Sequence, residues 1–145
     1  MRTANRVRPK TDFGIDVRLF TAQTGMTVKE LADRSGFEAV NLGDGLEREI
    51  TTPFCCDLLS IAMSRAPAGC AWVTVMGNMN TLAVAALTDA AAVILAEGAA
   101  LDEAAAKKAA DQEITVLKTE EPIFEAALKI YNFMRETSEG NGAGQ

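Results

Sequence analysis

Apolar and polar residues follow two different periods in the second half of the chain. Three short apolar runs alternate with three stretches of helical spacing, at 71–75, 80–89, 91–96, 102–113, 114–118 and 122–134. Short apolar runs bounded by turn residues are typical of buried strands, whereas apolar residues three and four positions apart are typical of helices. Strands that alternate with helices form βαβ units. The pattern therefore predicts an α/β fold, with a mostly parallel sheet that helices cover on both faces.

The residues before this alternating half predict a short helix and a hairpin. Thr27 and Glu30 have the spacing of a capping box, so a helix should follow and end near Gly36. The segments 37–42 and 46–51 read as two strands, and the turn sequence Gly-Asp-Gly separates them. We expect these two segments to pair as a small N-terminal hairpin.

A further helix is predicted between the hairpin and the alternating half. Pro53 should end the hairpin, and the apolar residues of 58–66 have helical spacing. Asp57 stands directly before this segment, where a side-chain oxygen can accept the first free N–H groups of a helix. Asp57 is therefore expected to be the N-cap of this helix.

The same pattern suggests one domain with a segment on either side. A chain of 145 residues with 48% hydrophobic residues can bury one substantial core. The domain should span 26–135, and residues 1–25 are expected to be a leader, although the alternation of their apolar residues also fits a short strand. The polar, glycine-rich segment 136–145 predicts a flexible tail.

Charge narrows the range of partners. The formal net charge is -6 and the sequence pI is about 4.7, whereas binding to nucleic acid or an anionic membrane needs clustered Lys and Arg. The one basic cluster lies within residues 2–10, and Asp12 and Asp16 interrupt its charge. No apolar stretch near it is long enough for a signal peptide or a membrane anchor. We expect a cytoplasmic protein that binds neither nucleic acid nor membrane.

Residue types exclude several chemistries. The chain has no histidine, so it has no His-based catalytic triad and no Cys/His zinc site. Neither the GxGxxG fingerprint nor the GxxxxGK[ST] loop occurs, which excludes dinucleotide binding and kinase or NTPase activity by those routes. The adjacent pair Cys55 and Cys56 lacks the spacing of structural zinc ligands, and with Cys70 it is expected to pack as small apolar residues. No metal, cofactor or catalytic residue is predicted.

One enzymatic alternative remains open. Cys55 or Cys56 could act as a nucleophile if a positive charge lowered the pKa of its thiol. Arg48 or Arg65 could supply that charge if the fold brings either one close.

Three strand-to-helix turns carry the candidate ligand site. In a parallel sheet, ligands bind beyond the carboxyl ends of the strands, where helix N-termini offer free N–H groups. Turns at 76–81, 96–98 and 118–122 should meet there, with Asn80 or Thr81 as the N-cap of the helix after the first. The alternative is that these turns serve only as turns and caps. The candidate ligand-binding residues are Asp57, Ser60, Gly77, Asn78, Asn80, Thr81, Glu97 and Gly98.

The order of these segments resembles a known family. The stretches CDLLSIAM, AWVTVMGNMNTLAVAAL, AAVILAEG and ITVLKTEEP, within residues 26–131, are similar to the DRTGG domain, in particular to its small stand-alone bacterial members. The resemblance implies an α/β regulatory module of the kind found in CBS-containing family II inorganic pyrophosphatases and in front of phosphate acetyltransferases. Such modules are associated with dimerisation and ligand sensing, not with catalysis.

The motif letters of that family are only partly kept. Asn78 and Met79 stand where the family has Asp-Arg, and 96–98 reads Ala-Glu-Gly where the family has Thr-Gly-Gly. Loss of the arginine removes a bidentate phosphate donor. Asn80 matches an asparagine of the stand-alone members, which is compatible with a neutral polar pocket.

Two functional hypotheses follow. The first is a homodimeric, non-catalytic regulatory domain that binds a nucleotide or a small polar metabolite at the carboxyl ends of its strands. The second is an interaction module that binds no ligand and docks a partner enzyme through exposed methionines, for which Met63, Met76 and Met79 are the candidates.

Overall fold

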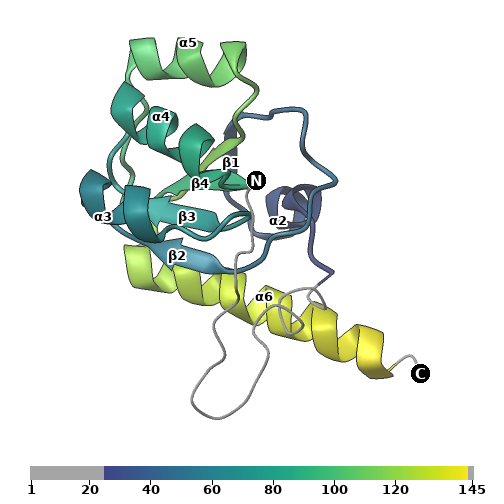
Figure 1. The fold of residues 1–145 in the computed structure, drawn as a ribbon. Coiled ribbons are helices and arrows are strands. Elements are labelled where there is room, and N and C mark those ends of the chain that lie inside the picture. Colours follow the sequence, from purple (N-terminus) through teal and green to yellow (C-terminus); the bar gives the residue numbers. More distant parts are fainter. Residues whose placement is uncertain (1–24, 144–145) are drawn as a thin grey trace.

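A five-stranded sheet forms the centre of the chain (Figure 1). The computed structural model describes residues 25–143, so the predicted leader lies outside the described residues except for Gly25. The strands lie in the order β1-β5-β4-β3-β2, and β2 to β5 run parallel while β1 runs antiparallel to β5. The prediction of a mostly parallel sheet is confirmed. The strands are β1 (Glu38–Asn41), β2 (Pro53–Cys55), β3 (Ala71–Thr74), β4 (Ala92–Leu95) and β5 (Val116–Lys118).

Helices cover both faces of the sheet, as the sequence predicts. Because β2, β3, β4 and β5 are neighbours in chain order, their three connecting helices pack on one face, and α2 and α6 cover the other. Figure 1 shows α6 running beneath β2 and β3. The helices are α2 (Val28–Arg34), α3 (Leu59–Arg65), α4 (Met79–Thr88), α5 (Glu103–Asp111) and α6 (Ile123–Ala143).

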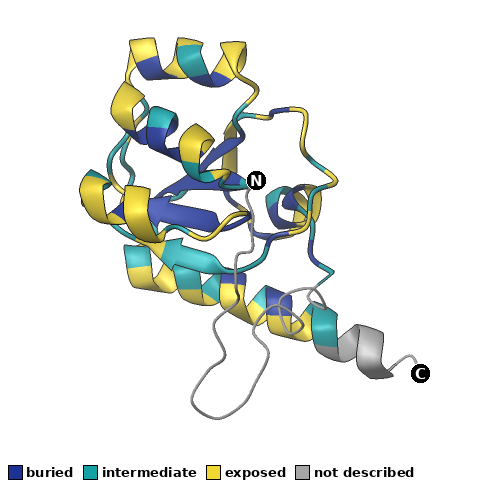
Figure 2. Cartoon of the chain, in the orientation of Figure 1, coloured by how far each residue is buried: buried dark blue, intermediate teal, exposed yellow. Residues whose placement is uncertain are grey.

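Alternation within the central strands divides the core in two. Successive side chains of a strand point to opposite faces. Trp72 therefore packs with Leu82 and the other residues under α3, α4 and α5, whereas Val73 packs with Ile130 under α6. The indole N–H of Trp72 donates to the carbonyl oxygen of Cys56 at 2.9 Å, so burial leaves this donor satisfied. Figure 2 shows the resulting buried strands between exposed helix surfaces.

The predicted N-terminal helix is confirmed and the predicted hairpin is wrong. Thr27 and Glu30 form the capping box of α2. The segment 37–42 does supply β1, but β1 pairs with β5 and not with 46–51. The side-chain amide of Asn41 holds it there by donating to the carbonyl oxygens of Ala109 (3.1 Å) and Ile114 (2.9 Å).

Two element boundaries also differ from the prediction. Pro53 begins β2, where the sequence predicts the end of a hairpin, because proline is tolerated at the first residue of an edge strand. Helix α6 continues to Ala143, through most of the segment 136–145 in which a flexible tail is predicted.

Candidate functional site

The turns at the carboxyl ends of the strands are tied to one another. The carbonyl oxygen of Gly77 accepts the N–H of Asp102 at 3.0 Å, which joins the β3–α4 turn to the β4–α5 connection. The N–H of Glu97 donates to the Glu121 carbonyl at 2.8 Å, and the N–H of Gly98 donates to the carbonyl of Thr119 at 2.9 Å. The structure thus brings the three predicted turns together beyond the carboxyl ends of the parallel strands. We call this end of the sheet the carboxyl edge.

Gly77 is needed for a close approach within the chain. A Cβ atom at this position would overlap the carbonyl oxygen of Ala100, far inside van der Waals contact, and would also lie 3.2 Å from the Cα of Leu101. Gly77 therefore lets two segments of backbone pack closely together. The neighbour is the protein's own backbone.

The N-cap of α4 is Asn78, so the prediction of Asn80 or Thr81 is wrong. The side-chain oxygen of Asn78 accepts the N–H of Thr81 at 3.0 Å, which makes Thr81 the third residue of the helix. Thr81 is completely buried. Asn80 lies in the first turn with its side chain exposed.

Asp57 does not cap α3, which is a second correction. Its Oδ1 accepts the hydroxyl of Thr74 at 2.6 Å and the N–H of Val75 at 2.9 Å, so it fastens the end of β3. The N-cap of α3 is Leu58, which makes no side-chain capping bond. Asp57 follows β2, and β2 pairs with β3. Its carboxylate therefore lies close to the end of β3 and binds there instead of capping α3. Ser60, in the first turn of α3, is exposed.

Glu97 and Gly98 both adopt left-handed backbone conformations, with φ of 60° and 73°. The Oε2 of Glu97 accepts the N–H of Ile123 at 3.3 Å and thereby caps α6. A Cβ at Gly98 would stand 2.6 Å from a carboxylate oxygen of Glu120. The carboxylate of Glu97, one of the candidate ligand-binding residues, therefore has a structural partner.

Sequence reasoning did not find the ion pair on the same edge. The Nζ of Lys129 donates to Glu121 Oε2 at 2.6 Å and to the carbonyl oxygen of Ser35 at 3.1 Å. Glu121 is 8 residues from Lys129, whereas Ser35 is 94 residues away, so no local sequence pattern could reveal the bond to Ser35. Lys129 fixes α6 against the turn that follows β5.

Cys55 and Cys70 do not have the environment of a nucleophile. Burial, with the carboxylate of Asp57 as the second cause, raises the pKa of the Cys55 thiol. Burial raises the pKa of Cys70 from its ordinary value of 9.0 to about 12. Arg48 pairs with Asp89, and its lowering effect on the pKa of Cys70 is smaller than the raising effect of burial. Among the described residues, no group of three or more Cys, Asp or Glu side chains could hold a metal ion, and no helix is long and apolar enough to cross a membrane.

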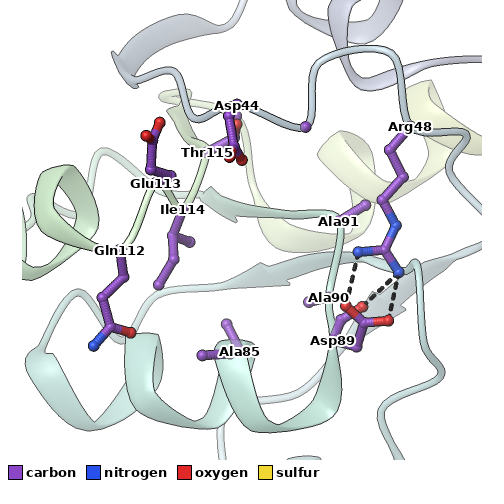
Figure 3. A pocket seen from close by; sticks show the side chains of 12 residues that line it. Asp44, Arg48, Ala85, Asp89, Ala90, Ala91, Gln112, Glu113, Ile114 and Thr115 are labelled. Carbon is purple, nitrogen blue, oxygen red and sulfur yellow. Dashed lines mark hydrogen bonds and ion pairs between the residues drawn. The ribbon is translucent and has the colours of Figure 1, made fainter.

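A pocket of about 260 Å³ lies at the opposite end of the parallel strands, where β4 and β5 begin (Figure 3). Ala85 and Ile114 contribute apolar surface, and Arg48 binds Asp89 through two N–H···O contacts of 2.8 and 2.9 Å. The carboxylates of Asp44, Asp89 and Glu113 outnumber the one guanidinium. This charge balance disfavours an anionic ligand in the pocket.

Comparison with known proteins gives a likeness in fold. Neither a protein-family model nor a curated protein sequence matches the chain. The structure is similar to the CBS and DRTGG domains of the regulatory region of Clostridium perfringens pyrophosphatase, solved in complex with the activator diadenosine tetraphosphate. The TM-score is 0.61 at 16% sequence identity over 80% of this chain. The chain spans 50% of that structure's length, so the likeness shows a shared α/β fold over about half of it.

Proposed function

We propose that this chain is a non-catalytic regulatory domain that binds a nucleotide or another small polar metabolite at the carboxyl edge of its sheet. The observation that carries this proposal is the start of α4. The first N–H groups of a helix have no acceptor within the helix and carry partial positive charge. The first turn of α4 contains no acidic residue, whereas those of α5 and α6 contain Glu103 and Glu125.

The surroundings of this helix start favour ligand binding. Asn80 exposes a neutral amide that can both donate and accept hydrogen bonds. Backbone bonds join the turn of Gly77 to the next connection, so a ligand would meet a rim that is already ordered. Ser60 and Asn80 are exposed polar candidates in the first turns of α3 and α4. Asp57, Gly77, Asn78, Thr81 and Glu97 would act by holding the rim in place.

The fold likeness supports a regulatory role. The regulatory region with the similar fold is described in complex with a nucleotide activator. By analogy, the present chain would form a homodimer, act in the cytoplasm and transmit ligand binding to a partner enzyme. A single domain over 26–135 would suffice for this role, because its core is built from α2 to α6.

Thermal denaturation with mononucleotides, dinucleotides and polyphosphates tests the proposal. A ligand at 100 times its dissociation constant should stabilise the protein by about 2.7 kcal/mol. Asn80→Ala should abolish the shift, and Asn132→Ala, which removes another exposed amide, on α6, should keep it. If no compound in the set shifts the melting temperature of the folded protein, the proposal fails.

A second candidate function rests on exposed apolar side chains. Leu58, Met63, Met79 and Leu87 on α3 and α4 are exposed by 58%, 45%, 47% and 71%. Flexible, polarizable methionines suit a docking surface. On this alternative the chain binds a partner enzyme through α3 and α4 and takes no ligand. Co-purification of one defined enzyme that Met79→Glu releases, together with a flat ligand screen, would favour it.

A further inference from the structure

The pocket of Figure 3 lies between three separate parts of the chain. Its walls are the loop of Asp44 and Arg48, the end of α4, and the turn from α5 into β5, with Ala85 and Ile114 as apolar surface. Its volume of about 260 Å³ is below the range of about 300–1,000 Å³ for pockets that hold drug-sized ligands. The space therefore suits a small metabolite.

Two helix ends make the pocket negative. Asp89 is the C-cap of α4 and Gln112 is the C-cap of α5, and both residues line the pocket. The C-terminus of a helix carries partial negative charge and favours cations. Arg48 supplies one positive charge, but Asp89 pairs with it at 2.8 Å. The carboxylates of Asp44 and Glu113 therefore give the pocket an excess of negative charge.

Glu113 stands at a position that disfavours an acidic residue. It directly follows the C-cap of α5, where the helix end repels a negative side chain. Its φ of 58° is left-handed, a conformation that glycine adopts without strain. Its carboxylate makes no hydrogen bond or ion pair with any of the residues that the structure describes. Sequences break such local rules mainly at functional sites, so this placement favours a role in binding.

The polar side chains of the pocket gather around a buried hydroxyl. Thr115 is 3% exposed, and its oxygen accepts the N–H of Gly43 at 2.9 Å. Gly43 precedes Asp44, and a Cβ on Gly43 would overlap the carbonyl oxygen of Glu113, so both acidic residues lie on the Thr115 side of the pocket. The second lone pair of the hydroxyl and its hydrogen have no partner within 25–143. A buried polar group left unpaired costs stability, so this hydroxyl favours a ligand that donates to it.

We propose that this pocket binds a short aliphatic diamine, which is protonated at neutral pH as the Lys side chain is. Three carboxylates and one guanidinium line the pocket and leave a net charge of -2, which a diamine matches. One ammonium group donates to Asp44, Glu113 and the free lone pair of Thr115, and the other lies at the end of α4. The methylene groups between them cover Ala85 and Ile114.

The donor set favours an organic cation over a metal ion. Among the described residues, no group of three or more Cys, Asp or Glu side chains could hold a metal ion. The pocket lies at the opposite end of the strands from the carboxyl edge, and its ligand has the opposite charge to a nucleotide. The inference therefore goes beyond the proposed function.

Isothermal titration calorimetry of the complete chain tests the pocket, with putrescine, a four-carbon diamine, as the ligand. Putrescine should bind, and butanediol, which has the same chain length without charge, should bind at least about tenfold more weakly. Glu113→Gln and Asp44→Asn should each raise the dissociation constant at least about threefold, because each removes one charge-assisted contact. Glu103→Gln is the matched control. It removes the same charge from the other end of α5 and should change the dissociation constant less than about twofold.

Glu113→Gly separates binding from folding. It should weaken putrescine binding as Glu113→Gln does, and it should raise the melting temperature, because glycine relieves both the left-handed strain and the charge at the helix end. The proposal is overturned if putrescine does not bind, if butanediol binds equally well, or if the folded Glu113 and Asp44 variants keep the wild-type affinity. An equal loss in Glu103→Gln would also overturn it, because attraction by net charge would then suffice. The carboxyl edge is tested with nucleotides and at Asn80, so the two sites can fail independently.

Discussion

A Cβ atom on Gly77 would overlap the carbonyl oxygen of Ala100, because the backbone of the β3–α4 turn meets that of the β4–α5 connection at these two residues. Gly77→Ala should therefore destabilise the protein by about 2 kcal/mol or more, since backbone on both sides would have to move. Urea denaturation measures this cost. Gly45→Ala is the control, because a Cβ there meets nothing within 4 Å, and it should change the free energy of unfolding by less than about 0.5 kcal/mol.

Asp57 should contribute to stability through β3. Asp57→Ala leaves the Val75 N–H and the Thr74 hydroxyl without their acceptor, and we expect a loss of about 1–3 kcal/mol. Asp57→Asn keeps one oxygen in place and should cost clearly less. Equal costs for the two substitutions in chemical denaturation would show that these hydrogen bonds do not stabilise the fold.

Substitutions of the two asparagines at the start of α4 should have different effects, one on stability and the other on ligand binding. Asn78→Ala removes the N-cap oxygen and should cost about 1 kcal/mol. Asn80 is exposed, so Asn80→Ala should leave the melting temperature nearly unchanged while abolishing any ligand-induced shift. The reverse order of costs would place the N-cap at Asn80.

Cys70 should make stability depend on pH in the alkaline range. Its folded-state pKa of about 12 lies above the ordinary value of 9.0, so the unfolded chain loses this proton first as pH rises. The resulting contribution is complete below pH 9 and falls by up to about 1.4 kcal/mol per pH unit between pH 9 and 12. Other groups also titrate there, so the readout is the difference between the wild type and Cys70→Ala. Parallel stability profiles would contradict the prediction.

The alternating half of the fold could be predicted because buried parallel strands are continuous apolar runs. Trp72 and Val73 point to opposite faces, yet both are buried, so the strand appears in the sequence as an uninterrupted apolar segment. The predicted hairpin is wrong because it pairs two segments that are close in sequence, 37–42 and 46–51. Glu38 instead pairs with Lys118, 80 residues later, and the side chain of Asn41 holds that pairing.

The location of the candidate site was easier to predict than the roles of its residues. Turns after parallel strands meet at one edge whatever their sequence, so the three turns were found. The partners of Glu97 and Asp57 are Ile123 and Val75, and these contacts depend on which strands are neighbours. The pocket of Figure 3 was missed for the same reason, because Arg48 and Asp89 are 41 residues apart.

The position of α6 at the end of the described chain has a consequence for synthesis. The α6 side of β3 and β4, with Ala71, Val73 and Ile94, is covered by Ala126, Ile130 and Met134. A nascent chain that has emerged only as far as β5 therefore exposes that apolar face. This holds even if the core beneath α3, α4 and α5 has already formed. Chaperone binding during translation should be strongest in this interval, and it should decrease when α6 leaves the ribosome.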